Sequence, residues 1–139
     1  MAVEVRISYH QSQDLLKFGQ FFLDLYDDDG HQQMIQLKFD IDNLWNYARD
    51  TTSVAFDFLV LAMSVYNADR AVNRAKYSEE GWKRMIRLQV PVLNMVAMRN
   101  GLPYFKSAID FLTGDEWDLV FVQAEPYNYA PSRIRFENL

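Results

Sequence analysis

The pattern of hydrophobic and polar positions predicts four β-strands in this chain, three of them by alternation. In residues 3–9, apolar side chains fall on one face and polar or charged side chains on the other, which is the pattern of a half-buried strand. The same alternation occurs in residues 34–41 and 84–92. Residues 117–123 are largely apolar on both faces, which indicates a strand placed centrally in the sheet.

Helical spacing of apolar residues predicts one long helix and one short helix. Residues 54–74 keep three- and four-residue spacing, and their first half is apolar almost all round, which is typical of a buried helix. A short helix is predicted over residues 104–112. Pro103 suits its first turn, and Gly114 suits the C′ position that follows a helix.

The sequence leaves alternatives open elsewhere. Residues 14–26 have helical spacing weakened by Gly19, but they form a hairpin with residues 34–41 if residues 21–26 are extended. The Asp- and Gly-containing residues 27–31 predict a turn. The remaining segments are expected to be loops at 77–81 and 93–101, a helical turn at 44–50 and a last short strand at 134–136.

These elements predict an α+β fold in a single domain. We expect a mixed or antiparallel sheet of about four strands, packed by one long buried helix and one short helix. Residues 1–123 form the expected domain, and residues 124–139 are expected to be a Pro- and Tyr-rich tail or linker.

Composition narrows the functional classes. Half of the 139 residues are hydrophobic and none is cysteine, so the chain can form a sizeable core but no disulfide or thiolate metal site. The net charge of −5 argues against non-specific nucleic-acid binding, which needs a basic surface. No signal peptide and no membrane span is read in the sequence, so a cytoplasmic location is expected.

Catalytic chemistry has no recognisable motif here. The sequence contains no Gly-rich phosphate loop, no serine nucleophile elbow and no zincin pair, so we predict neither an enzyme nor a cofactor. The acidic residues 27–29 with His31 lack the ligand ladder of a calcium hand, which favours a solvated turn and no metal site.

Several charged and aromatic residues admit both a structural and a binding interpretation. Asp69 and Arg70, near the end of the long helix, favour a structural pair, with Asp69 accepting from Trp82 or from nearby backbone amides. Arg84 and Trp117 are also expected to be structural, and the three tryptophans to fill a core rather than stack bases. The alternative is an anion site formed by Arg70, Arg84 and Arg87.

Three motifs occur in order between residues 54 and 123. They read Val65-Tyr66-x-Ala68-Asp69-Arg70, then Trp82-x-Arg84-x-Ile86-x-Leu88-x-Val90-Pro91-Val92, then Phe111-Leu112-Thr113-Gly114-Asp115-x-Trp117. In this order they resemble the N-terminal leader domain of QueC-like (QatC-type) proteins of bacterial anti-phage defence islands. In that family the domain precedes a PP-loop ATPase domain similar to 7-cyano-7-deazaguanine synthase.

The chain departs from the family in its chemistry. The PP-loop signature Ser-Gly-Gly-x-Asp-Ser is absent, and so is the cysteine cluster that holds zinc in the synthases. The resemblance therefore implies a leader domain without the ATPase domain, and it transfers no catalytic residue.

Three functions follow as expectations. The first is a non-catalytic interaction or scaffold domain of an anti-phage defence system, bound to a QueC-like enzyme or its partner protein. The second is a small anion- or nucleotide-sensing domain, and the third is a phage- or plasmid-encoded decoy of the leader domain. We expect the chain to bind a protein partner and to bind neither nucleic acid nor a membrane. Assembly into a homo-oligomer is a further alternative. The expected partner contacts are Met95, Met98, Leu102, Tyr127 and Tyr129.

Overall fold

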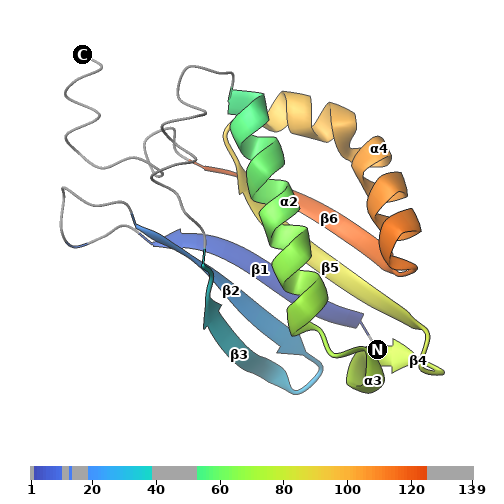
Figure 1. The fold of residues 1–139 in the computed structure, drawn as a ribbon. Helices are drawn as coiled ribbons and strands as arrows, with labels where there is room; N and C mark the ends of the chain where they lie inside the picture. The colour runs from blue at the N-terminus through green and yellow to red at the C-terminus, as the bar shows by residue number, and fades with distance from the viewer. Residues whose placement is uncertain (1, 11–12, 14–18, 39–52, 125–139) are drawn as a thin grey trace, which may run out of the picture.

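The computed structural model of the protein describes residues 2–10, 13, 19–38 and 53–124. Figure 1 shows two long helices lying on one face of a twisted sheet. We call this side the helix face and the other side the opposite face. The strands are β1 (Ala2–His10), β2 (Gln20–Asp27), β3 (Gly30–Gln36), β4 (Ser78–Glu79), β5 (Lys83–Val92) and β6 (Glu116–Gln123), and the helices are α2 (Ser53–Ala71), α3 (Arg74–Tyr77) and α4 (Met95–Thr113).

The sheet is mixed, with β1 between an antiparallel half and a parallel half. β2 runs antiparallel to β1, and β3 forms a hairpin with β2. On the other side β5 runs parallel to β1, and β6 runs parallel to β5. Because parallel neighbours need a crossover connection, α4 joins β5 to β6, and α2 lies between β3 and β5 in the chain.

The core lies between the sheet and the helices. Register places Leu25, Val5, Leu88 and Leu119 in one row across β2, β1, β5 and β6, and all four side chains are buried. Alternation along each strand turns their neighbours to the opposite face, where charged and polar groups such as Arg6 are accommodated. The buried row therefore follows from the period-two pattern of the sequence.

The ends of α4 are set by local chemistry. The Asn94 side chain accepts from the Ala97 amide at 3.1 Å and so satisfies a free donor of the first turn. At the other end Gly114 is left-handed, with φ 74°, and its amide donates to the Asp110 carbonyl at 2.9 Å. The prediction that Gly114 ends a helix is confirmed.

The number of elements predicted from the sequence is wrong. The α+β class and the mixed sheet are observed, but the described residues form six strands and three helices, not about four strands and two helices. β2 is extended because Phe21, Leu23 and Leu25 are all buried against the core, so the alternating pattern prevails over helical spacing. β4 is a two-residue strand within the predicted loop 77–81.

The second helix was also predicted too short. α4 begins at Met95, inside the predicted irregular segment 93–101, and it contains Pro103 instead of starting there. Proline lacks the amide donor of one helical hydrogen bond, so a proline favours the prediction that a helix starts there. The helix continues through Pro103 because Met98, Phe105 and Ile109 pack against the core on both sides of it.

Most other predicted elements are observed with shifted ends. The strands expected at 3–9, 84–92 and 117–123 correspond to β1, β5 and β6, and the helix expected at 54–74 corresponds to α2. The central position expected for 117–123 is wrong: within the described residues β6 pairs with β5 alone and lies at the edge of the sheet, with one face buried against α4 and the other partly open. The strand expected at 34–41 is only partly matched, because β3 ends at residue 36. The segments 44–50 and 134–136 lie outside the described residues, as does almost all of the expected tail.

Replacing Gly114 should destabilise the protein because of the backbone conformation at this residue, not because of a steric clash. A Cβ atom at this position would meet nothing within 4 Å, so the cost of Gly114→Ala comes from the left-handed conformation. We expect a loss of about 1 kcal/mol in the free energy of unfolding, measured by urea denaturation, and a smaller loss for Gly114→Asn. Equal stability of the glycine and alanine forms would contradict this assignment.

Candidate functional site

A buried guanidinium group joins three parts of the fold. Arg84, at the start of β5, is only 2% exposed. Its Nη1 atom donates to the carbonyl oxygens of Asp69 and Val72 at 2.9 and 2.6 Å, at the end of α2. Its Nη2 atom donates to the Asp69 carboxylate and, at 2.6 Å, to the Asp115 carboxylate. A buried charge is tolerated when it is paired and hydrogen-bonded in this way.

The second cation of this cluster is Arg74. Its two terminal nitrogens donate to the two oxygens of Asp115 at 2.7 and 2.9 Å, which is the bidentate geometry that arginine favours with carboxylates. It also donates to the backbone carbonyl of Trp82. We call Asp69, Arg74, Arg84 and Asp115 the ion-pair network. It links the end of α2, α3, the start of β5 and the α4–β6 turn.

The network changes the acidity of Asp115. Burial alone would raise the pKa of this carboxyl group. Hydrogen bonds from the Arg84 and Arg74 side chains and from the Arg84 amide outweigh burial and hold the pKa well below its ordinary value of 3.8. Asp115 is therefore ionised wherever the protein is folded near neutral pH.

A second buried carboxylate positions the start of α4. Asp57 on α2 is fully buried, and its two oxygens accept from the amides of Leu93 and Asn94 at 2.7 Å each. Burial raises the pKa of Asp57, whereas the two amide donors favour its ionised form. This contact ties the β5–α4 turn to α2.

An apolar groove of about 380 Å³ lies between α2 and α4. The two helices diverge toward their C-terminal ends (Figure 1), and the Phe58 and Phe105 rings lie 6.1 Å apart at its narrower part. The wider end of the groove contains polar groups, among them Asp69 of the ion-pair network. We define the α2–α4 groove by its lining residues Phe58, Leu61, Ala62, Val65, Tyr66, Asp69, Phe105, Ala108, Ile109, Leu112 and Thr113.

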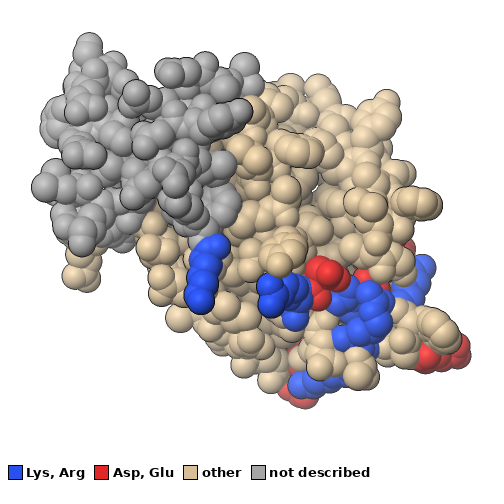
Figure 2. All heavy atoms as spheres, viewed as in Figure 1, with Lys and Arg blue, Asp and Glu red and all other residues tan. Residues whose placement is uncertain are grey.

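The apolar surface extends beyond the groove along α4. Phe111 is 87% exposed and Leu112 is 79% exposed, and Val96 and Tyr104 are exposed on the same helix. Figure 2 shows the surface over α2 and α4 largely free of charge, whereas charged side chains gather near the end of α2. Exposed apolar patches of this kind are typical of interaction sites.

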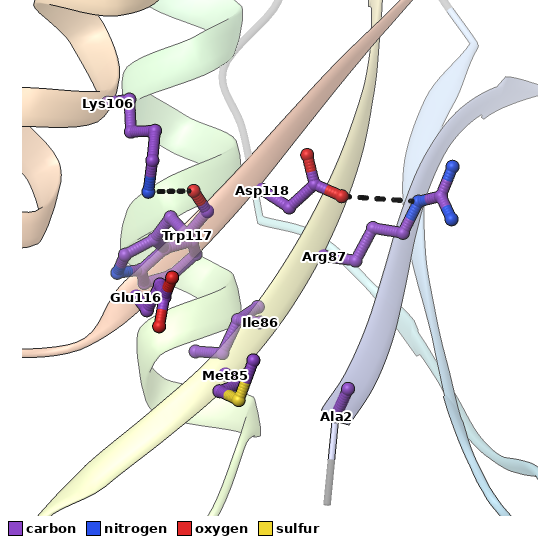
Figure 3. Close-up of a pocket in the computed structure, with 8 residues that line it drawn as sticks. All are labelled: Ala2, Met85, Ile86, Arg87, Lys106, Glu116, Trp117 and Asp118. Carbon is purple, nitrogen blue, oxygen red and sulfur yellow. Dashed lines mark hydrogen bonds and ion pairs between the residues drawn. The ribbon is translucent and has the colours of Figure 1, made fainter.

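Another hollow, of about 420 Å³, lies where β1, β5 and β6 begin (Figure 3). Its charged groups already contact protein atoms. Arg87 Nε lies 3.8 Å from Asp118 Oδ2, and Lys106 Nζ donates to the Trp117 carbonyl oxygen at 2.8 Å and to Asp110. The described residues that line the hollow do not direct a set of polar groups toward one point where a ligand would bind.

The structure does not bring the three arginines of the predicted anion site together. Arg84 is buried on the helix face, within the ion-pair network. Arg87 is three residues further along β5, so its side chain lies on the opposite face, beside Asp118. Arg70 is exposed near the end of α2 and donates to the Tyr66 hydroxyl at 2.9 Å.

The structure matches some of the structural and partner-contact roles predicted from the sequence and not others. Asp69 is a structural partner of Arg84, and within the described residues it forms the expected pair with neither Arg70 nor Trp82. The expectation that the tryptophans fill a core is wrong for Trp82, whose side chain is exposed, and Trp45 lies outside the described residues. Trp117 is buried, and its indole donates to Thr113 Oγ1 at 2.8 Å. Of the predicted partner contacts, Met98 is fully buried, and Met95 and Leu102 are partly buried against the core. Tyr127 and Tyr129 lie outside the described residues.

Sequence reasoning missed Arg74 and Asp115 as a pair and missed the α2–α4 groove. The two charged residues are 41 positions apart, so no local pattern connects them. The exposed apolar residues of α4 do carry a signal. Once the helix begins at Met95, Val96, Tyr104, Ala108, Phe111 and Leu112 fall on one side of it.

Comparison of the chain with protein-family models, curated proteins and solved structures gives no match. Among residues 2–10, 13, 19–38 and 53–124, no group of three or more His, Cys, Asp or Glu side chains is arranged to hold a metal ion. No helix in that part of the chain is long and apolar enough to cross a membrane.

Removing the central guanidinium should be far more costly than removing an exposed one. Arg84→Met leaves the buried carboxylate of Asp115 without its main partner, and we expect a loss of about 3 kcal/mol or more in the free energy of unfolding. Arg87→Met, on the other face of the same strand, is the matched control and should cost about 0.5 kcal/mol or less. Similar losses for the two variants in urea denaturation would contradict the assigned role of Arg84.

The lowered pKa of Asp115 predicts a pH dependence with a definite sign. A carboxyl group whose pKa is lower in the folded state adds stability above its unfolded pKa, here 3.8, and loses it as the pH falls toward the folded pKa. In an NMR titration, the Asp115 carboxyl carbon should keep its ionised chemical shift from neutral pH down to roughly pH 3. A titration midpoint at or above 3.8 would show that the arginines do not control this carboxyl group.

Proposed function

We propose that this chain is a non-catalytic protein-interaction domain that binds a protein partner through α2 and α4. The observation that carries the proposal is the exposed apolar surface formed by the α2–α4 groove, whose lining includes Leu112, and by the neighbouring residues Tyr104 and Phe111. Burying large aromatic and aliphatic side chains supplies most of the binding energy at the centre of protein interfaces.

The proposed setting is a bacterial anti-phage defence system in the cytoplasm. The partner would be a QueC-like PP-loop enzyme or a protein encoded beside it. Support comes from the three motifs that resemble the leader domain, since Asp69, Arg84 and Asp115 of those motifs are three of the four residues of the ion-pair network. The motifs therefore coincide with the residues that hold the end of the groove in place.

An anion- or nucleotide-sensing function has less support. Arg84 is already paired within the ion-pair network, and Arg87 lies on the other face of the sheet. A decoy of the leader domain would use the same apolar surface, and it differs from a scaffold only in its effect on defence.

Two polar substitutions on α4 test the proposal. Phe111→Gln with Leu112→Gln removes the most exposed apolar side chains while keeping good helix formers, so the free energy of unfolding should change by about 0.5 kcal/mol or less per site. Binding of the full chain to the QueC-like enzyme or a co-encoded protein should weaken at least about tenfold in biolayer interferometry.

The matched control is Met34→Gln with Met85→Gln. These two exposed methionines lie on the opposite face of the sheet, paired in register with Asp24 and Ala2. The control should bind like the unmodified chain. Unchanged binding by the α4 variant, or equal loss in both variants, would overturn the assignment of the interaction surface.

A further inference from the structure

The α2–α4 groove is long enough to bind a helix. Along α2 its lining extends from Phe58 to Asp69, which corresponds to about 17 Å or three helical turns. Its polar groups lie at one end, and its remaining lining is aliphatic or aromatic. An amphipathic helix can place apolar side chains into such a groove at positions i, i+4, i+7 and i+11.

The polar end of the groove carries net positive charge. Around it, the cations Arg70, Arg74 and Arg84 outnumber the carboxylates of Asp69 and Asp115, although the whole chain has a net charge of −5. Figure 2 shows basic side chains, with some acidic ones among them, below the uncharged surface.

Arg70 is the cation of this end that remains accessible to a partner. Within the described residues it forms no ion pair. Its guanidinium lies 5.5 Å from the centre of the Tyr66 ring and donates to the Tyr66 hydroxyl at 2.9 Å. Tyr66 lines the groove, so these contacts hold the guanidinium beside the groove's polar end.

We propose that the occupant of the α2–α4 groove is an amphipathic helix of a partner protein, with an acidic residue at one end of its apolar stripe that pairs with Arg70. This inference deepens the proposed function and rests on it. The apolar lining of the groove binds the apolar stripe of the partner helix. The positive charge at the wider end determines which way the helix runs.

A second copy of this chain fits the groove less well. Docking through the same surface, it would bring another basic end. The carboxylate that lines its groove, Asp69, is already paired with Arg84. A partner helix with its own acidic residue supplies the missing charge.

The test uses the full chain as bait for a displayed library of helical peptides of about 18 residues. Four positions at helical spacing vary among apolar and polar residues, and the positions flanking them vary among Glu, Gln and Lys. We expect selection to keep the apolar stripe and to enrich Glu at one end. A Glu-ended peptide should bind up to about fivefold more tightly than its Gln-ended form, as expected for an exposed ion pair.

Charge reversal at Arg70 identifies the contact. With Arg70→Glu as bait, the preference for Glu should disappear or change to Lys. Lys76→Glu makes the same change in charge on α3, and this control bait should keep the preference for Glu. Enriched peptides without helical spacing, or the same preference with both baits, would overturn the inference.

The outcomes separate this inference from the proposed function. If the α4 variant loses its partner protein but no helical peptide is enriched, the surface binds proteins and the helical occupant is wrong. If the α4 variant keeps its partner protein, the proposed function itself fails. A concentration-dependent dimer that is lost in the α4 variant would identify a second copy as the occupant and overturn the helix proposal.

Discussion

The structure depends on satisfying one buried positive charge. Arg84 can lie in the core because α2 supplies two carbonyl oxygens and the Asp69 carboxylate, and the α4–β6 turn supplies Asp115. These partners come from two separate parts of the chain, the segment 69–72 and Asp115. The guanidinium therefore requires the end of α2, the start of β5 and the start of β6 to meet at one point, since an unpaired buried charge would cost several kcal/mol.

The same contacts shape the candidate interaction surface. Asp69 lies both in the ion-pair network and at the wider end of the α2–α4 groove. Thr113, also in the groove lining, accepts from the Trp117 indole and so fixes the end of α4 to β6. The two helix ends are thus each attached to the sheet. Their separation leaves apolar side chains exposed between them, and this is the physical basis for proposing a partner helix.

The sequence predicted the parts of this account that depend on local periodicity. Period-two alternation located β1 and β5, an apolar run located β6, and Gly114 was expected to follow a helix. Pro103 obscured the start of α4, because its effect on a helix depends on packing farther along the chain. The anion-site hypothesis grouped Arg84 with Arg87, although residues three apart on a strand point to opposite faces. The pairing of Arg84 with Asp115 spans 31 positions and exists only once β5 and β6 align, so local patterns could not reveal it.

A double-mutant cycle between Arg84 and Asp115 tests the central claim most directly. The free energy of unfolding would be measured for the unmodified chain, Arg84→Met, Asp115→Asn and the double variant. The account predicts a coupling energy of at least about 1 kcal/mol, because the second substitution costs little once the first has broken the network. Additive losses, with a coupling within about 0.3 kcal/mol of zero, would show that the buried pair does not hold the fold together.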